Sequence, residues 1–175
     1  MSEILEGRVA IITGAGGGLG AAHARVFAAE GCAVIVNDIN VEAAQAVVDE
    51  ITAAGGKAAV NSSDITNYDD SLNAVKQAID SYGDLHIVVN NAGVNRDRMF
   101  ASMTEQEWDT IMAVHLKGHF CITSHAVHYW RGQSKEGKAV DARIINTTSG
   151  AGLQGSIGQS NYAAAKAGIA ALTLN

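Results

Sequence analysis

The sequence predicts an α/β fold in which helices cover both faces of a doubly wound parallel sheet. Short apolar runs rich in β-branched residues recur along the 175-residue chain. Each run is followed by a stretch of helical length, often rich in alanine. The runs are apolar on both faces, which is typical of parallel strands buried between two layers of helices.

The first half of the chain contains three pairs of one strand and one helix. The strands are expected at residues 8–13, 33–37 and 57–60, the last being the weakest. The helices are expected at residues 18–30, 41–54 and 68–82.

The second half continues this alternation. We expect strands at 85–89 and 143–146, a long helical region at 104–130 that is broken once, and a final helix at 161–174. The polar stretch 131–138 is most simply a solvated loop before the fifth strand.

The composition excludes several classes of protein. Lys and Arg total 12 against 18 Asp and Glu, which gives a net charge of −6. The sequence has no basic cluster of the kind that binds nucleic acid. Hydrophobic residues make up 47%, which excludes a disordered chain. No apolar run approaches the ~20 residues that cross a bilayer. Residues 1–7 lack the layout of a signal peptide, so we expect a cytoplasmic protein with Cys32 and Cys121 reduced and buried.

A glycine-rich segment, TGAGGGLG at 13–20, joins the first strand to the first helix. Glycine admits positive φ values and lets backbone N–H groups approach a pyrophosphate without a Cβ in the way. The positive end of the following helix would then face the phosphates. A tight turn with small residues for packing is the alternative, and the position between strand and helix favours the phosphate site.

Asp38 ends the second strand, 18 residues after Gly20. A carboxylate at this point can accept hydrogen bonds from the adenosine ribose hydroxyls of NAD, and it repels the 2′-phosphate of NADP. No Arg or Lys lies in the glycine loop or directly after Asp38, so the sequence favours NAD. The alternative role for Asp38 is to cap the next helix, for which Asn40 is equally suited.

Two further segments follow strands at the same edge of the predicted sheet. Asp64 comes after the third strand, where it either hydrogen-bonds the adenine amino group or caps the next helix. Residues 90–93, NNAG, place amide and small residues after the fourth strand, as either a cofactor contact or an ordinary turn.

Tyr162 and Lys166 are four residues apart on the final predicted helix, so their side chains share one face. An ammonium at ~4 Å favours the phenolate by about 4 kcal/mol when the effective dielectric is ~20, before desolvation offsets part of it. The tyrosine can then exchange a proton with a carbinol or carbonyl oxygen. Ser149 lies just past the fifth strand, where it can hydrogen-bond the same oxygen.

Together these residues resemble the short-chain dehydrogenase/reductase family, whose domain has a Rossmann-type fold. The shared motifs cover essentially the whole chain in family order: Thr13-Gly14-x-x-x-Gly18-Leu19-Gly20, Asp64, Asn90-Asn91-Ala92-Gly93, Ser149 and Tyr162-x-x-x-Lys166. The resemblance implies that Tyr162 is the proton donor and acceptor, that Ser149 orients the substrate oxygen, and that Lys166 activates the tyrosine and binds the nicotinamide ribose. It also implies that NAD contacts Gly14, Gly18, Leu19, Gly20, Asp38, Asp64, Ile65, Asn91, Tyr162 and Lys166.

Residues 91–98 and 114–118 are similar to the (3R)-hydroxyacyl-CoA dehydrogenase branch found in peroxisomal multifunctional enzymes. The resemblance implies hydride transfer between NAD and a secondary alcohol or ketone, such as a 3-hydroxyacyl thioester or a hydroxysteroid. Members of the family pair through the long helix and the final helix, so a homodimer or homotetramer is expected.

The chain departs from the family at two points. His115 stands in the long helix where the family commonly has Asn, at the point that extends the proton relay to solvent, and a histidine there would add a pH dependence. The family's chains are also longer. We therefore expect residues 1–175 to form a single dinucleotide-binding and catalytic domain that lacks its C-terminal strands, with an exposed edge at the fifth strand. The apolar residues Ala164, Ile169 and Leu172 of the final helix would then need cover.

Two other functions stay open. The chain would bind NAD without catalysis or act as an interaction module if it is truncated, although the intact Ser149, Tyr162 and Lys166 argue against this. An NADP-dependent 3-oxoacyl reductase is the third possibility, and Asp38 argues against it.

No metal site is expected. His115 and His119 are four residues apart, and His125 and His128 three, which is a metal-ligand spacing on a helix. No Asp or Glu lies between them and the HExxH pattern is absent, so histidines on a helix face are the better account.

Overall fold

The computed structural model describes residues 4–174 and confirms the doubly wound α/β fold. Residues 1–3, which belong to the N-terminal stretch considered above, and residue 175 lie outside the described part. One sheet of five parallel strands has the order β3-β2-β1-β4-β5. The strands are β1 (Val9–Thr13), β2 (Ala33–Asn37), β3 (Lys57–Asn61), β4 (Ile87–Asn90) and β5 (Arg143–Asn146).

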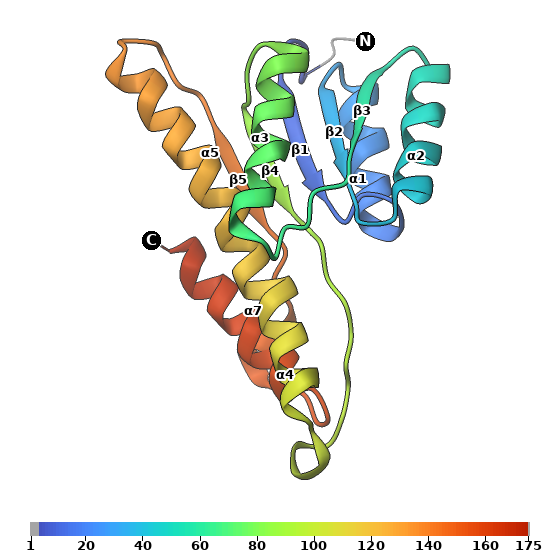
Figure 1. Ribbon diagram of the computed structural model, residues 1–175, viewed down its shortest axis with the longest axis vertical. Helices are drawn as coiled ribbons and strands as arrows, with labels where there is room; N and C mark the ends of the chain where they lie inside the picture. Colours follow the sequence, from blue (N-terminus) through green and yellow to red (C-terminus); the bar gives the residue numbers. More distant parts are fainter. Residues whose placement is uncertain (1–3, 175) are drawn as a thin grey trace.

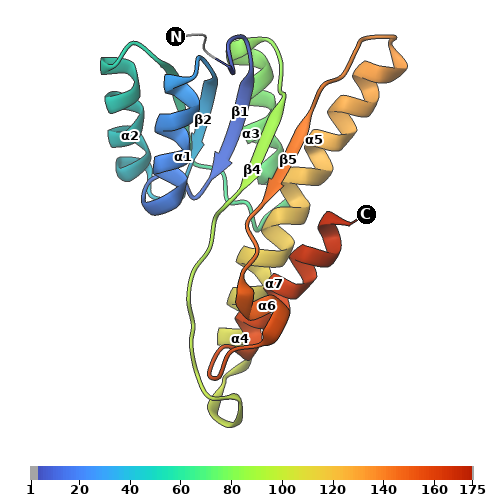
Figure 2. The same ribbon diagram turned by 180° about the vertical axis from the view of Figure 1, so that it is seen from behind.

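Four helices flank the sheet, as the alternation of elements predicts. They are α1 (Gly18–Ala29), α2 (Val41–Ala53), α3 (Tyr68–Tyr82) and α5 (Gly118–Lys135). The first two cover one face and the last two cover the other (Figure 1, Figure 2). Successive strand residues therefore enter two different cores, with Ile12 and Val34 on the face of α1 and α2, and Ile11 and Ile35 on the opposite face.

The order of the strands places a ligand crevice at the middle of the sheet. From β1 the chain runs outward to β2 and β3, and then returns to β4 and β5 on the other side of β1. The carboxyl ends of β1 and β4 therefore flank the topological switch point, where ligands bind in sheets of this kind.

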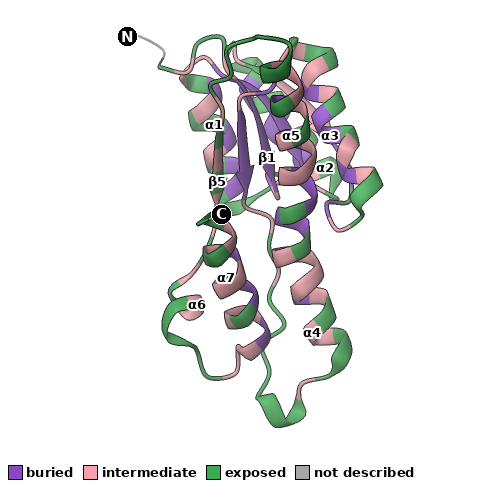
Figure 3. Ribbon diagram, turned by 90° about the vertical axis from the view of Figure 1, so that its left-hand side faces the viewer, coloured by how far each residue is buried: buried purple, intermediate pink, exposed green. Residues whose placement is uncertain are grey.

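A second group of elements lies beyond the carboxyl ends of the strands (Figure 1, Figure 2). It consists of the 3₁₀ turn η1 (Phe100–Ser102), α4 (Glu105–Ile111), the π-helical turn η2 (Met112–Lys117), α6 (Gly150–Gln154) and α7 (Ser160–Thr173). Buried residues concentrate in the sheet and in the helix faces against it, whereas α4 and α6 are largely half-buried or exposed (Figure 3).

The long helical region is confirmed, and its single break is η2. The helices α4 and α5 continue into one another through this π turn without an intervening loop. Thr104 starts the region with a capping box, in which its hydroxyl accepts from the Glu107 N–H and the Glu107 carboxylate accepts from the Thr104 N–H.

The solvated loop predicted for 131–138 is wrong in its first part, because α5 continues to Lys135. Polar residues on an exposed helix are compatible with helical structure, and the stretch contains no proline to stop it. The helix ends where Gly137 adopts a φ of +80°, in the left-handed region that favours glycine. Helix α6 was not predicted from the sequence, because it is short and glycine-rich and depends on a Ser149 cap.

The fifth strand is an edge strand, as expected, and Arg143 and Ile145 are exposed on it. The apolar residues of the final helix differ in their cover, since Ile169 is fully buried while Leu172 is half-buried and Ala164 is exposed. Within residues 4–174, no helix is both long and apolar enough to cross a membrane.

Candidate active site

The glycine-rich loop joins β1 to α1 at the switch point, as predicted. Gly14 and Gly18 have positive φ values of 63° and 52°. A Cβ on Gly20 would lie 2.2 Å from the carbonyl oxygen of Gly14, so only glycine allows the helix to start this close to the loop. The packing alternative is therefore true of Gly20, while Gly17 and Gly18 face open space.

The start of α1 fits the phosphates of a dinucleotide. The residue that caps α1, Gly17, has no side chain to occupy the free N–H groups, and the first turn contains no acidic residue. A helix of 12 residues thus presents its positive end toward open space beside glycines. This arrangement suits an anionic pyrophosphate.

Asp38 holds the glycine loop against the end of β2. Its Oδ2 accepts a hydrogen bond from the Gly16 N–H at 2.9 Å, and its Oδ1 accepts from the Asn40 N–H at 2.9 Å. The cap of α2 is Asn40, whose side chain accepts from the Ala43 N–H, so Asp38 does not have the capping role considered as the alternative. The carboxylate is thereby fixed beside the loop.

Asp64 and Asn91 have local structural partners. The Oδ1 of Asp64 accepts hydrogen bonds from the backbone and the hydroxyl of Thr66, while the cap of α3 is Asn67. The Nδ2 of Asn91 donates to the carbonyl oxygens of Thr13 and Gly14 at 3.0 and 3.3 Å, which ties the end of β4 to the glycine loop.

Ile65 is a core residue at the same edge of the sheet. It is buried, and its Cδ1 would lie 2.8 Å from a Cβ placed on Gly118 at the start of α5.

Lys166 and Tyr162 lie together on the buried side of α7. The Lys166 Nζ is 5.5 Å from the centre of the Tyr162 ring. It donates a hydrogen bond to the Thr147 carbonyl oxygen at 2.5 Å. Burial lowers the pKa of Lys166 to about 8, since the residue is only 2% exposed.

Ser149 is brought next to this pair by α6. Its Oγ accepts from the Ala151 N–H at 3.2 Å, and the neighbouring Thr148 hydroxyl donates to the Lys166 carbonyl oxygen at 2.8 Å. A Cβ on Gly152 would lie 2.7 Å from the Lys166 carbonyl carbon, so α6 packs tightly on α7. The three predicted catalytic residues therefore gather at the carboxyl edge of the sheet.

His115 lies in η2 against Tyr162. The two rings meet edge to face with their centres 5.2 Å apart. The Nε2 of His115 is 2.8 Å from the carbonyl oxygen of Val94 and 3.1 Å from its N–H, so the bond it makes depends on its tautomer. Burial lowers its pKa, and the Val94 contact opposes the shift. A lowered pKa favours the neutral ring, which weakens the pH dependence expected for it.

Two residues hold the site together through contacts that the sequence did not predict. The hydroxyl of Thr13 accepts from the N–H groups of Asn91 and Ala92, at 3.0 Å each. Asn161 is fully buried and ties the start of α7 to the neighbouring segments. An asparagine next to a helix start reads as an exposed polar residue, so the sequence carries no signal for its burial.

The histidines do not form a metal site in the described part of the chain, where no group of three or more His, Cys, Asp or Glu is placed to hold an ion. His125 contacts the Tyr68 carbonyl oxygen, and His128 contacts that of Ser124. A cavity of about 580 Å³ lies elsewhere, at the opposite end of the sheet between α1 and α2. Its walls include the Arg25–Glu50 ion pair and contain none of the predicted site residues. This cavity is therefore separate from the candidate active site.

The site agrees with comparisons to known proteins. A family model described as short chain dehydrogenase matches residues 8–175. The chain is 49% identical, over 98% of its length, to hydroxyacyl-CoA dehydrogenase ChsB1 of Mycobacterium tuberculosis. It is 43% identical, over 95% of its length, to peroxisomal multifunctional enzyme type 2 of Mus musculus. A crystal structure of a short chain dehydrogenase from Mycobacterium avium superposes with a TM-score of 0.96, at 57% identity and over 98% of the chain.

The chain spans 56% of the first relative, 23% of the second and 64% of the solved chain. These relatives confirm the likeness to the hydroxyacyl-CoA dehydrogenase branch that residues 91–98 and 114–118 predict. The matched family model and the shared fold lead to one conclusion: the chain belongs to the short-chain dehydrogenase family.

Proposed function

We propose that this protein is an NAD-dependent oxidoreductase that interconverts a secondary alcohol and a ketone, with 3-hydroxyacyl thioesters as its substrate class. The observation that carries the proposal is the Lys166 ammonium, buried 5.5 Å from the centre of the Tyr162 ring and beside the segment that carries Ser149. A phenol and a lysine ammonium held side by side at the carboxyl edge of the sheet are groups through which a proton can be exchanged with a substrate oxygen.

Each residue then has one task. Tyr162 takes the hydroxyl proton of an alcohol substrate, or returns it to a carbonyl. Lys166 holds its ammonium beside the Tyr162 ring, and Ser149 hydrogen-bonds the same substrate oxygen. Bound NAD would accept or donate the hydride, which is chemistry that the protein only positions. The edge of the His115 ring against Tyr162 supports a place for this histidine beside the proton path.

The cofactor proposal rests on the glycine loop and Asp38. The open, uncapped start of α1 would hold the pyrophosphate, with Gly14, Gly18, Leu19 and Gly20 along the loop. Asp38 would accept from the adenosine ribose, since its carboxylate is fixed at the loop by Gly16 and Asn40. The same charge disfavours a 2′-phosphate. By this argument NADH should bind the wild-type chain more tightly than NADPH in a fluorescence titration, and the reverse order would favour the reductase alternative.

Three further contacts are proposed for the cofactor. Asp64 would hydrogen-bond the adenine amino group, and Ile65 and Asn91 would contact the cofactor at the same edge of the sheet. The bonds of Asn91 support this, because they hold the end of β4 against the glycine loop, and the Asp64 carboxylate is fixed in a turn by Thr66. The substrate class is supported by the name of the mycobacterial relative, a hydroxyacyl-CoA dehydrogenase.

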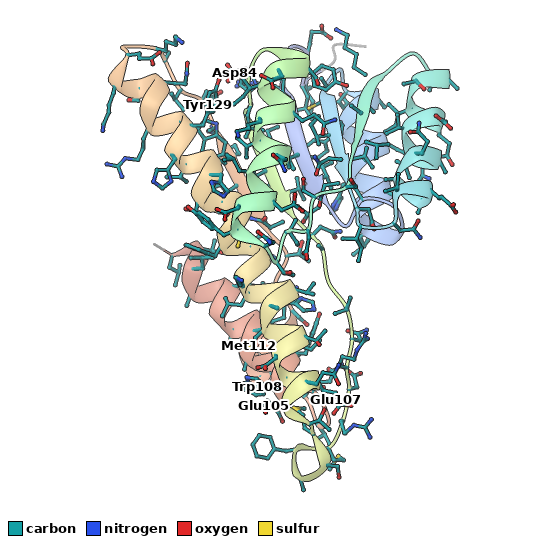
Figure 4. The ribbon with its side chains drawn as sticks, in the orientation of Figure 1. Asp84, Glu105, Glu107, Trp108, Met112 and Tyr129 are labelled. Carbon is teal, nitrogen blue, oxygen red and sulfur yellow. The ribbon has the colours of Figure 1, made fainter. Side chains whose placement is uncertain are left out.

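The test compares wild type with Tyr162→Phe, using NAD reduction by a 3-hydroxyacyl-CoA as the assay. Loss of the group that takes the substrate's hydroxyl proton should lower kcat by about 10²- to 10⁴-fold and leave NAD binding unchanged. The control is Tyr129→Phe. The Tyr129 hydroxyl donates to Asp84 at 2.8 Å. These two side chains lie at the opposite end of the molecule from α4, the helix that packs against α7 (Figure 4). Full activity of Tyr162→Phe refutes the mechanism. A wild type that binds NAD without turning over any hydroxyacyl thioester supports the binding-only alternative.

We also propose a homodimer or a homotetramer. A groove of about 500 Å³ lies across α4, η2, α5 and α7, with Met112, Leu116, Phe120 and Leu172 in its walls. Phe120 is 49% exposed there, and a second copy of the chain would cover this apolar face. Light scattering of the eluted protein should give a mass at least twice that of the chain, and a monomer overturns the proposal.

A further inference from the structure

Asn37 is a buried amide at the carboxyl edge of the sheet, and the proposed reaction gives it no role. It is the last residue of β2 and is 2% exposed, and its register partner is Asn61, the last residue of β3. The Nδ2 of Asn37 donates to the Asn61 Oδ1 at 2.7 Å and to the Ser63 carbonyl oxygen at 3.0 Å. Both donors of this amide therefore reach the end of β3 and the segment that follows it.

Two more amides extend this contact into a chain that consists of Asn37, Asn61 and Gln77. The Asn61 Nδ2 donates to the Gln77 Oε1 at 2.9 Å, and the Gln77 Nε2 donates to the Val60 carbonyl oxygen at 2.8 Å. Each amide fixes the orientation of the next, because its nitrogen only donates and its oxygen only accepts. This amide chain therefore joins β2, β3 and α3 through neutral side chains.

The peptide group between Ser63 and Asp64 is held at both of its polar atoms. Its carbonyl oxygen accepts the 3.0 Å bond from Asn37, and its N–H donates to the Asp70 carboxylate on α3 at 2.6 Å. A planar peptide group that is bonded at both its oxygen and its nitrogen does not turn without breaking one of these bonds. Asn37 and Asp70 therefore fix the direction in which the chain enters Asp64.

The backbone of Asn37 is joined to the other parts of the proposed cofactor site. Its carbonyl oxygen accepts from the Ala15 N–H in the glycine loop at 2.9 Å. The next residue is Asp38, whose N–H donates to the Asn61 carbonyl oxygen at 3.0 Å. Asn37 thus bonds the loop proposed for the pyrophosphate, precedes the carboxylate proposed for the ribose, and bonds the segment proposed for adenine.

We propose that Asn37 is a positioning residue for the adenosine half of the cofactor. Its side-chain amide holds the Asp64 segment in a fixed position relative to Asp38, so that both carboxylates meet the same bound adenosine. A neutral amide does this without neutralising either carboxylate. A site that is held in place before binding loses less conformational freedom when the ligand arrives, and this raises affinity. The inference rests on the proposed function for its ligand, whereas the fixed peptide group does not.

The experiment compares Asn37→Ala with Gln77→Ala. Each variant removes two hydrogen bonds of the amide chain, but only those of Asn37 reach Ser63. The probe is ADP-ribose, which contains the adenosine and the pyrophosphate without the nicotinamide, in a calorimetric titration. The Kd of Asn37→Ala should rise about tenfold, and that of Gln77→Ala should stay within about twofold of wild type. Equal weakening in both variants, or an unchanged Kd in Asn37→Ala, overturns the inference.

Steady-state kinetics and thermal unfolding separate positioning from stability. Both variants should lower Tm, because each loses two bonds, so a fall in Tm alone does not reproduce the difference in Kd. Asn37→Ala should raise the KM for NAD about tenfold and change kcat by less than about twofold, since adenosine contacts are the same in the ground state and the transition state. A loss of kcat with an unchanged KM contradicts a role at the adenosine half.

Two measurements need no ligand. In Asn37→Ala the Asp64 N–H should exchange with solvent at least about tenfold faster than in wild type, and equal rates overturn the inference. A crystal structure of the wild-type chain should show the Ser63 carbonyl oxygen within about 3.2 Å of the Asn37 Nδ2. A peptide group turned away from Asn37 overturns the inference even if Asn37→Ala does not fold. A wild type that binds neither NAD nor ADP-ribose contradicts the proposed function, and with it the binding role of Asn37.

Discussion

The replacement Asn161→Ala tests how α7, the helix that carries Tyr162 and Lys166, is held in place. The side chain of Asn161 is fully buried directly before Tyr162. Its Nδ2 donates to the carbonyl oxygens of Arg96 and Glu107 at 3.1 and 3.2 Å. Its Oδ1 accepts from the N–H of Tyr162 at 2.8 Å. One amide therefore joins α7 to α4 and to the loop after β4.

The magnitude follows from these three bonds. Each buried hydrogen bond contributes about 1 kcal/mol net, so Asn161→Ala should lower the free energy of unfolding by about 3 kcal/mol. For a chain of this size, that loss corresponds to a fall in Tm of about 6 to 12 °C. The loosened start of α7 should also lower kcat by about tenfold, because Tyr162 is the first residue that the amide holds.

Urea unfolding and turnover of a 3-hydroxyacyl-CoA measure the two effects. The control is Asn73→Ala, since Asn73 is exposed on α3 and its Nδ2 bonds only the nearby Asp70 carboxylate among the contacts described. This control should stay within about 0.5 kcal/mol of wild type. A loss below 1 kcal/mol in Asn161→Ala, together with an unchanged kcat, refutes the positioning argument.

Three other predictions concern the lysine, the glycine loop and the cofactor. Burial lowers the pKa of Lys166 from 10.5 to about 8, so between these pH values the folded chain binds fewer protons than the unfolded chain. The unfolding free energy of wild type relative to Lys166→Met should therefore rise as pH increases from 8 to 10.5, and a flat difference contradicts the shift. Gly20→Ala would place a Cβ 2.2 Å from a backbone oxygen, so it should lower the free energy of unfolding by about 3 kcal/mol and weaken NAD binding. The control is Gly132→Ala in α5, which has open space around it and should be neutral or stabilising. Asp38→Asn keeps an acceptor for the Gly16 N–H but removes the negative charge. The ratio of NADPH affinity to NADH affinity should therefore rise at least about tenfold in titrations. An unchanged ratio would show that Asp38 does not select the cofactor.

The sequence alone determined the order and type of nearly all the main elements. The bounds of β2, α3 and β5 are those predicted, because apolar strands and capped helices repeat with clear punctuation. The motif residues also lie where the spacing predicts, since parallel strands bring their carboxyl ends to one edge of a sheet. The glycine loop and the Tyr162–Lys166 pair are local patterns, and local patterns are visible in a single chain.

Tertiary structure decided which polar residues are buried and what they contact. Asn161 and His119 look like ordinary polar positions, yet both are buried, because their neighbours come from segments far away in the sequence. Tertiary structure also made Asp38 an anchor of the glycine loop, because the fold brings the Gly16 N–H to its carboxylate. Burial and hydrogen bonding depend on neighbours that are distant in the sequence, so periodicity along one chain predicts the frame of this site but not the contacts that hold its side chains.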